Sequence, residues 1–132
     1  MGIRVSWDND EHTALLFTFE GRWDLNDFYT GVKEGNGLMD SAHQPVHSIF
    51  DLTRGNALPP GFVGAIRSIG AKPHAHMGQM AVVGANTFVT SFVNLFGKLF
   101  PDNTKSRRAI FAFTLDDARA KLAAANKTIE SA

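Results

Sequence analysis

The sequence predicts a single α/β domain, built as one mixed five-stranded sheet flanked by four helices. Two observations predict this fold. The chain opens with two segments rich in β-branched and aromatic residues, separated by a short polar turn. From Pro45 onward, an apolar strand-like segment alternates three times with a helix-like segment. Such alternation is typical of parallel strands joined by right-handed helical crossovers.

The two opening segments, residues 3–7 and 14–23, are predicted to form an antiparallel hairpin. Residues 8–11 between them are all polar and supply the turn. The hairpin is therefore expected to cap a sheet whose remaining strands are parallel.

A helix is predicted to follow the hairpin directly. Asp24 offers an N-cap, and Leu25, Phe28 and Val32 recur at helical spacing. Glycines at positions 31, 35 and 37 lower the helix propensity of the same segment. The expected helix is therefore weakened by glycine.

Three strand–helix units make up the rest of the predicted domain. Their strands are expected to be buried on both faces, because runs such as Ala81-Val82-Val83 carry no polar residue. Prolines and capping residues mark the helix ends. The expected strands span residues 46–52, 79–84 and 109–113, and the expected helices span residues 60–71, 87–100 and 115–128.

Length and composition indicate one globular core. The chain has 132 residues, of which 44% are apolar and 20% charged, as in ordinary globular domains. No linker or repeat divides it, so one domain over residues 1–132 is expected, with 129–132 as a flexible tail. Without cysteine there is no disulfide framework and no thiol nucleophile.

The charge balance and the hydropathy pattern narrow the expected partners. The chain has 13 basic and 13 acidic residues, so no global field draws it to nucleic acid. No stretch approaches the ~18 consecutive apolar residues of a membrane span. A cytoplasmic location without a transmembrane segment is therefore expected.

Several short motifs punctuate the predicted elements. They are Gly21-Arg22-Trp23 before the first helix, Phe50-Asp51-Leu52 in a strand, Pro59-Pro60-Gly61 opening a helix, and Val82-Val83-Gly84-Ala85 followed by Phe88 and Leu99-Phe100-Pro101. With the order of elements, these motifs resemble the anti-sigma-factor antagonist class, the STAS or SpoIIAA-like fold. The closer likeness is to small uncharacterised bacterial members. The resemblance covers nearly the whole chain and implies a regulatory role without catalysis.

Open α/β sheets usually bind ligands where the carboxyl ends of parallel strands meet helix N-termini. The candidate binding or regulatory residues at this edge are Asp51, Thr53, Arg54, Asn56, Asn86 and Thr87. A structural role competes with this interpretation, because Asn86 or Thr87, and also Thr114, are suited to capping helices. Arg54 stands apart, because a cation near a helix N-terminus opposes the helix dipole and invites an anion or a carboxylate.

The resemblance also implies a phosphorylation switch. In the resembled family, a serine at the start of the second helix carries the phosphate, which changes binding through its charge. Here the corresponding residues, 57–61, contain no hydroxyl side chain. The switch is therefore absent or displaced, with Thr53 as the candidate position.

Four histidines precede two of the expected parallel strands. His43 and His47 flank the start of one strand, and His74 and His76 precede the next. Four imidazoles at one edge of the sheet would suit a zinc ion. The spacing is not that of a zinc-binding helix, because Pro45 separates the first pair. No metal site is therefore predicted, and these histidines are expected in solvent-exposed loops.

The expected helix over residues 87–100 carries more apolar surface than one sheet needs. Its apolar residues cover an arc of about 160°, against the ~100° of an ordinary core-facing stripe. A homodimer or partner interface through this helix is therefore predicted, with deep burial in the core as the alternative. The interface candidates are Phe88, Phe92, Val93, Phe96 and Phe100.

The predicted function is a non-catalytic regulatory or protein-interaction module, expected to be homodimeric and to act on an unknown protein partner. No nucleophile elbow, phosphate-binding loop or dinucleotide fingerprint occurs, so neither an enzyme nor a cofactor is predicted. An alternative function is a carrier for a small apolar or lipid-like ligand, held among the phenylalanines of residues 87–100. A second alternative is an enzyme whose constellation the sequence does not reveal.

Overall fold

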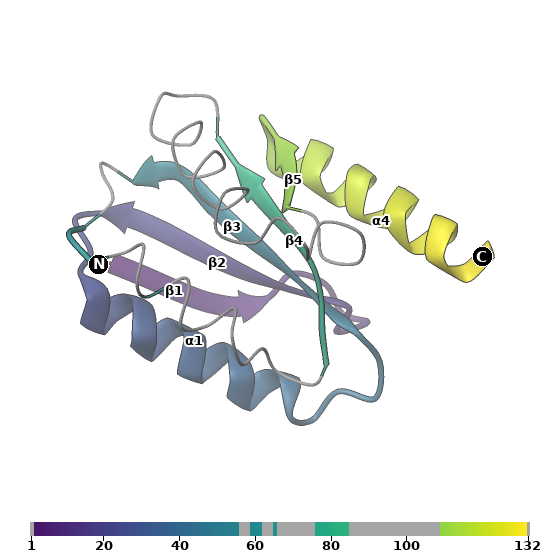
Figure 1. The fold of residues 1–132 in the computed structure, drawn as a ribbon, viewed down its shortest axis with the longest axis horizontal. Coiled ribbons are helices and arrows are strands. Elements are labelled where there is room, and N and C mark those ends of the chain that lie inside the picture. The colour runs from purple at the N-terminus through teal and green to yellow at the C-terminus, as the bar shows by residue number, and fades with distance from the viewer. Residues whose placement is uncertain (1, 56–58, 62–64, 66–75, 85–108, 132) are drawn as a thin grey trace.

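The computed structural model describes residues 2–55, 59–61, 65, 76–84 and 109–131. These residues form five strands and two helices, with two strands before the first helix and three strands between the two helices (Figure 1). The elements are β1 (Gly2–Trp7), β2 (Ala14–Gly21), α1 (Leu25–Met39), β3 (Val46–Gly55), β4 (Met77–Val83), β5 (Ala109–Ala112) and α4 (Leu115–Ser131).

The strands form one mixed sheet in the order β1-β2-β3-β4-β5. β1 and β2 pair antiparallel, as expected for a hairpin, and each later strand pairs parallel with the strand before it. Four neighbouring strands are therefore parallel, and only β1, at the edge, runs the other way. The carboxyl ends of β3, β4 and β5 consequently lie at one edge of the sheet.

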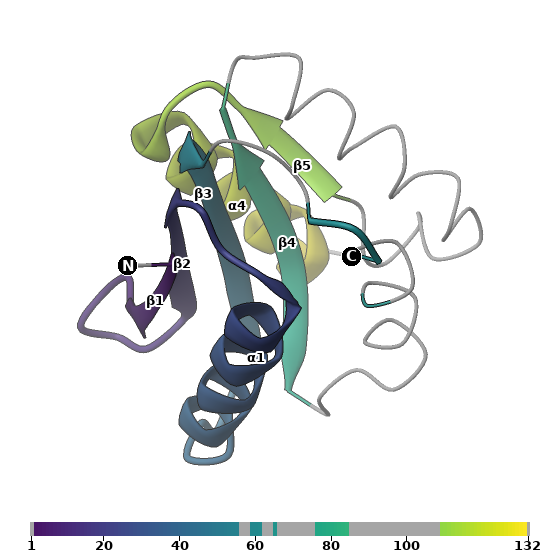
Figure 2. The ribbon, with the colours of Figure 1, turned by 90° about the vertical axis from the view of Figure 1, so that its left-hand side faces the viewer.

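The two described helices cover opposite faces of the sheet (Figure 2). On the face of α1, a large cluster gathers the aromatic side chains of β2 and β3 around Phe19 and Phe50. On the face of α4, a smaller cluster packs Ala118 and Leu122 of the helix against Ile49 and Ala81. The central strands are buried on both faces, which explains why their sequences lack the alternation of a one-sided sheet.

α1 begins as predicted at Asp24, whose side chain caps the helix through a reciprocal capping box with Asp27. Its glycines have a packing role. A Cβ at Gly31 would lie 3.2 Å from Ile3, and a Cβ at Gly35 would lie 2.8 Å from Phe17. Two of the helix-weakening glycines are therefore where α1 approaches the sheet most closely.

The expectation of four flanking helices is corrected to the two that the described residues form, α1 and α4. Apolar residues at helical spacing indicate that one side of a segment is buried, and this pattern alone does not determine the backbone. Most of residues 60–71 and all of residues 87–100 lie outside the described part of the chain. Within the first range, Ala65 is helical and buried, and its N–H donates to the carbonyl of Gly61.

Several element ends differ from the predicted ones. β3 continues to Gly55, three residues beyond the expected end, because Arg54 and Gly55 still pair with Glu20 and Gly21 of β2. Thr53 and Arg54, expected in a loop, are therefore strand residues. β2 ends at Gly21, before Trp23, where the backbone turns with φ of 58°. α4 ends at Ser131, beyond the expected Thr128.

Candidate functional site

A shallow pocket of about 450 Å³ lies at the carboxyl ends of the parallel strands, against the first turns of α4. This is the edge of the sheet at which ligand binding was expected from the sequence. Its wall combines residues of β3, β4 and α4 with the short link between β5 and α4. The lining residues are Asp51, Thr53, Arg54, Val83, Phe113, Thr114, Leu115, Asp116 and Arg119.

Asp51 and Thr53 of β3 form a hydrogen-bonded pair in this wall. The hydroxyl of Thr53 donates to Oδ1 of Asp51 at 2.6 Å, and the backbone N–H of Thr53 donates to the same oxygen at 3.0 Å. Asp51 is buried, whereas Thr53 is exposed. The carboxylate thus holds an accessible threonine hydroxyl in a defined orientation, and both groups come from one strand.

Arg54 is the more exposed of the two cations that line the pocket, with 68% of its side chain exposed, against 44% for Arg119. Nη1 of Arg54 lies 3.6 Å from Oε1 of Glu20 on the neighbouring strand, and the same carboxylate oxygen accepts from Arg4 of β1. The carboxylate that Arg54 was expected to attract is therefore supplied by its own chain. Glu20 is thus shared between Arg4 and Arg54.

The start of α4 supplies the opposite wall. Thr114 caps the helix, as predicted, by accepting a hydrogen bond from the N–H of Asp117 at 3.1 Å. Arg119, one turn further on, donates from Nη1 to Asp116 and from Nε and Nη2 to Asp8. The hydrogen bond to Asp8 and the charges of both carboxylates raise the pKa of Arg119 above its ordinary value.

Phe113 also lines the pocket and is 72% exposed. It follows β5 directly and precedes the cap residue Thr114. Large apolar side chains are usually buried, and the exposure of Phe113 distinguishes it from the buried phenylalanines Phe17, Phe19, Phe28 and Phe50. Sequence reasoning missed Phe113 as a site residue, because it counted this residue as the last of a buried strand.

The fold of this chain is similar to that of a solved structure over most of the length of both chains. The solved structure is that of an uncharacterised protein of the DUF3478 family with a SpoIIAA-like fold, from Shewanella loihica PV-4. The two align with a TM-score of 0.69 and 15% sequence identity, over 92% of this chain and 94% of that chain. The present chain has a SpoIIAA-like fold. No family model matches the sequence, and no curated protein matches it.

The SpoIIAA-like fold confirms the resemblance drawn from the motifs and gives no activity by itself. Three of the six candidate residues, Asp51, Thr53 and Arg54, do line one pocket of this fold. Asn56, Asn86 and Thr87 lie outside the described residues, as do the interface candidates Phe88, Phe92, Val93, Phe96 and Phe100.

Three of the four candidate histidines are described, His43, His47 and His76, and they lie toward the opposite edge of the SpoIIAA-like sheet, where β3 and β4 begin. His47 is buried, contrary to expectation, and its Nδ1 accepts the N–H of Gln79 at 2.8 Å. The ring nitrogen Nδ1 of His76 lies 2.9 Å from the carbonyl of Met39, and His43 is exposed. His74 is not among the described residues. Within the described part of the chain, no three metal-ligating side chains gather.

Arg119 is a second site residue that the sequence did not predict. Its position three residues after Asp116 is the only local signal, and an i,i+3 ion pair on a helix is common. Its main partner, Asp8, lies 111 residues away along the chain.

No described helix of this SpoIIAA-like chain combines the length and the hydropathy that crossing a membrane requires.

Proposed function

We propose that this chain is a regulatory module that binds a protein partner through the pocket at the carboxyl ends of β3, β4 and β5. The observation that carries the proposal is Phe113, an exposed aromatic side chain set among charged residues in a shallow pocket. Aromatic residues and arginine are enriched where protein interfaces are buried, and polar residues form the rim. Phe113 would supply the apolar contact, and Arg54 would supply a charge-assisted one.

The pairing of the charged side chains in the pocket favours a binding role over a catalytic one. Each described charged side chain that lines the pocket already has a partner within the chain. Asp51 holds Thr53, Arg54 lies near Glu20, and Arg119 holds Asp8 and Asp116. A general acid or base must instead be within reach of a substrate proton. Such a preorganised wall suits recognition of a partner without a chemical step.

Thr53 supplies a means of regulating this pocket. Its hydroxyl is accessible and hydrogen-bonded to Asp51, at the end of β3 beside Arg54. A phosphate on Thr53 would add about −1.5 to −2 charges next to the Asp51 carboxylate and would end that hydrogen bond. It would also place new acceptors beside Arg54. We therefore expect phosphorylation of Thr53 to change partner binding by altering the charge of the pocket wall.

The partner contact can be tested with a photo-crosslinking amino acid at position 113, and with the same amino acid at position 29 as a matched control. Tyr29 is the other large apolar side chain exposed in the described residues, at 45%, and it lies on α1 away from the pocket. We expect one protein of the source organism to be cross-linked through position 113 and not through position 29. Phe113→Ala should weaken binding of that protein, and Tyr29→Ala should not.

Equal cross-linking from both positions, or none from position 113, would rule out the pocket as the docking site. Thr53 is tested separately, by mass spectrometry of protein isolated from the source organism and by comparing Thr53→Glu with Thr53→Ser in the same binding assay. Unmodified Thr53 under all growth conditions, with equal binding by both variants, would remove the regulatory role and leave the docking role standing.

The other predicted functions rest on residues outside the described chain. A homodimer through the helix expected over residues 87–100, and a carrier pocket among its phenylalanines, stay predictions, as does a cytoplasmic location. Charged side chains line the pocket beside Phe113, whereas sites for apolar ligands are lined mainly by apolar side chains. This difference favours the protein-binding module over the carrier.

A further inference from the structure

β1 is the edge strand of the sheet, and among the described residues it pairs with β2 alone (Figures 1 and 2). An edge strand has one row of backbone N–H and C=O groups that no neighbouring strand uses. Which residues of β1 carry this free row determines what can pair with it.

A hydrogen bond just beyond the end of β1 shows which residues of β1 direct their backbone N–H and C=O groups toward β2. Asp8 donates its N–H to the carbonyl of Ala14 at 2.8 Å, and these residues continue the register in which Trp7 faces Leu15. Residues that bond directly across an antiparallel ladder alternate with residues whose groups point away. The even-numbered residues of β1 therefore bond to β2, and Ile3, Val5 and Trp7 direct their N–H and C=O groups to the free edge.

The other side of β2 supports the same assignment independently. His47 of β3 donates its N–H to the carbonyl of Thr13 at 2.8 Å. The odd-numbered residues at this end of β2 therefore bond toward β3, which leaves the even-numbered residues for β1.

β1 lacks most of the features that block further pairing. It contains no proline, and its register with β2 runs from Gly2 to Trp7 without a bulge. Its one charged residue, Arg4, is ion-paired with Glu20. The apolar side chains Ile3, Val5 and Trp7 are packed against the core on one side and remain partly exposed.

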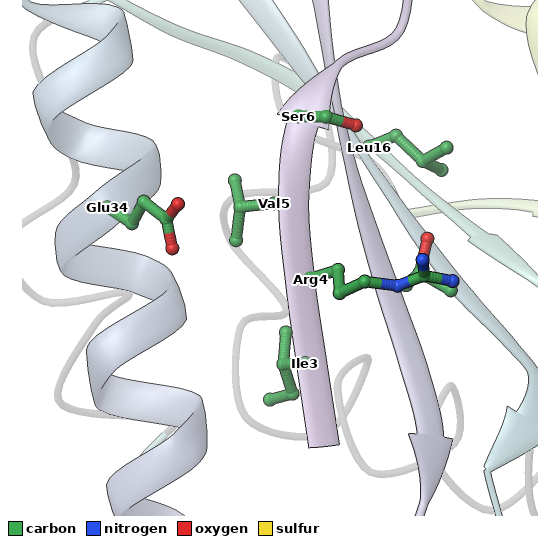
Figure 3. A pocket seen from close by; sticks show the side chains of 7 residues that line it. Ile3, Arg4, Val5, Ser6, Leu16 and Glu34 are labelled. Atoms are coloured by element: carbon green, nitrogen blue, oxygen red, sulfur yellow. The ribbon is translucent and has the colours of Figure 1, made fainter. Parts of the chain in front are cut away.

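A hollow of about 540 Å³ lies alongside this strand. Figure 3 shows Val5 pointing toward α1, and Arg4 and Ser6 pointing the opposite way. Glu34 of α1 points toward the strand on the side of Val5 (Figure 3). The free edge therefore has an apolar side beneath α1 and a polar side away from it.

We propose that β1 pairs antiparallel with β1 of a second copy of this chain, about a two-fold axis at Val5. In this register Val5 faces Val5 of the second copy, and Ile3 faces its Trp7. All three outward-facing residues then exchange hydrogen bonds with the second copy. The two sheets become continuous, and the surface used is distinct from the pocket around Phe113.

The side chains favour this register over its neighbours. With the axis at Val5, Arg4 faces Ser6 of the second copy, and the partly exposed apolar side chains lie next to one another. With the axis at Arg4, two arginines would face each other directly, and Trp7 would have no partner within the second β1. A strand whose apolar and polar residues match its own sequence in reverse is suited to a symmetric partner.

α1 limits the strength of this association. The helix lies directly over β1, since Gly31 is in close contact with Ile3 and Val5. Pairing therefore brings the Glu34 carboxylates of the two copies toward the two-fold axis. Two like charges near the axis repel each other and weaken dimer formation. We therefore expect Glu34→Gln to lower the dissociation constant of the dimer about two- to fivefold.

The experiment measures amide hydrogen exchange and molecular mass of the full chain over a range of protein concentrations. We expect a reversible dimer at high concentration. The amides of Ile3, Val5 and Trp7 should become protected in proportion to the dimer. The amides of Arg4 and Ser6, bonded to β2, should be protected at every concentration.

Two substitutions complete the test. Val5→Pro removes an outward N–H without removing a hydrogen bond to β2, and it should weaken association about tenfold or more. Glu34→Gln acts in the opposite direction and keeps the test valid if the proline variant does not fold.

A chain that stays monomeric, with rapid exchange at Val5, overturns the proposal and leaves the edge available to a strand of another protein. A dimer in which the amides of Ile3, Val5 and Trp7 still exchange rapidly also overturns it, because another surface then forms the dimer.

Discussion

Arg119 of α4 holds the carboxylate of Asp8, which follows β1, with Nε and Nη2 at 2.7 to 3.2 Å from its two oxygens. The Asp8 side chain is 4% exposed, so its charge depends on this one arginine more than on solvent. The contact connects the turn of the β1–β2 hairpin with α4, which covers the face of the sheet opposite α1.

Removing this arginine should therefore destabilise the fold. We expect Arg119→Met to lower the free energy of unfolding by about 2 kcal/mol, because it leaves a buried carboxylate without its cation. Asp116→Asn is the matched control. It removes the other carboxylate bound by Arg119, but that side chain is 97% exposed and its loss should cost under about 0.5 kcal/mol. Urea unfolding of both variants measures the difference, and equal losses would contradict a special role for Asp8.

The same ion pair has a defined pH dependence on the alkaline side. The hydrogen bonds that Arg119 donates to the Asp8 carboxylate raise the pKa of Arg119 in the folded chain above its ordinary value. A cation whose folded pKa is raised contributes stability fully below its unfolded pKa, and loses it only as the pH rises through the folded value. The stability difference between the parent chain and Arg119→Met should therefore stay constant from neutral pH to about pH 11. A difference that shrinks within this window would contradict the assignment.

Two glycines of α1 should respond to alanine with opposite signs. At Gly35 the added Cβ would lie 2.8 Å from Cζ of Phe17, whereas at Gly37 it would meet nothing within 4 Å. We expect Gly37→Ala to stabilise the chain by about 0.5 to 1 kcal/mol through helix propensity. Gly35→Ala should destabilise it by about 1 to 3 kcal/mol, because the helix must move away from the sheet. Thermal unfolding distinguishes the two, and a shared sign would show that α1 packs differently.

His47 should contribute to stability as a hydrogen-bond acceptor. Its ring nitrogen Nδ1 accepts the N–H of Gln79, and a Cβ at Gly78 would lie 2.7 Å from that nitrogen. We expect His47→Ala to cost about 2 to 3 kcal/mol, because it removes a buried acceptor and leaves a cavity. His43→Ala, at an exposed position, should change the unfolding free energy by under about 0.5 kcal/mol. Similar costs at the two positions would show that His47 has no such role.

The elements that sequence reasoning placed well are those with local signals. Asp24 and Thr114 were expected as caps, and both accept hydrogen bonds from the N–H three residues later. The hairpin and the three parallel strands follow from apolar runs a few residues long. Half of the candidate residues at the functional edge line the pocket, because parallel strands bring their carboxyl ends together wherever the chain returns.

What the sequence could not supply depends on residues that are distant along the chain. β3 extends past its apolar run because Arg54 pairs with Glu20 of β2. No local sequence pattern in β3 indicates this pairing. The burial of His47 follows from its contact with Gln79 on the adjacent strand. The glycines of α1 were interpreted as weak points, and their packing role became visible only with Phe17 beneath them.

By itself, the sequence of this protein determined the opening hairpin, the later strand segments, the helix caps and the likeness to a SpoIIAA-like fold, because these depend on neighbouring residues and apolar periodicity. Tertiary structure alone decided that Asp8 is neutralised by Arg119, that Phe113 is exposed in a charged pocket, and that Val5 directs its backbone groups to a free edge. The physical reason is that burial, ion pairing and strand-edge direction are relations between segments. They come into existence only when the sheet has brought those segments together.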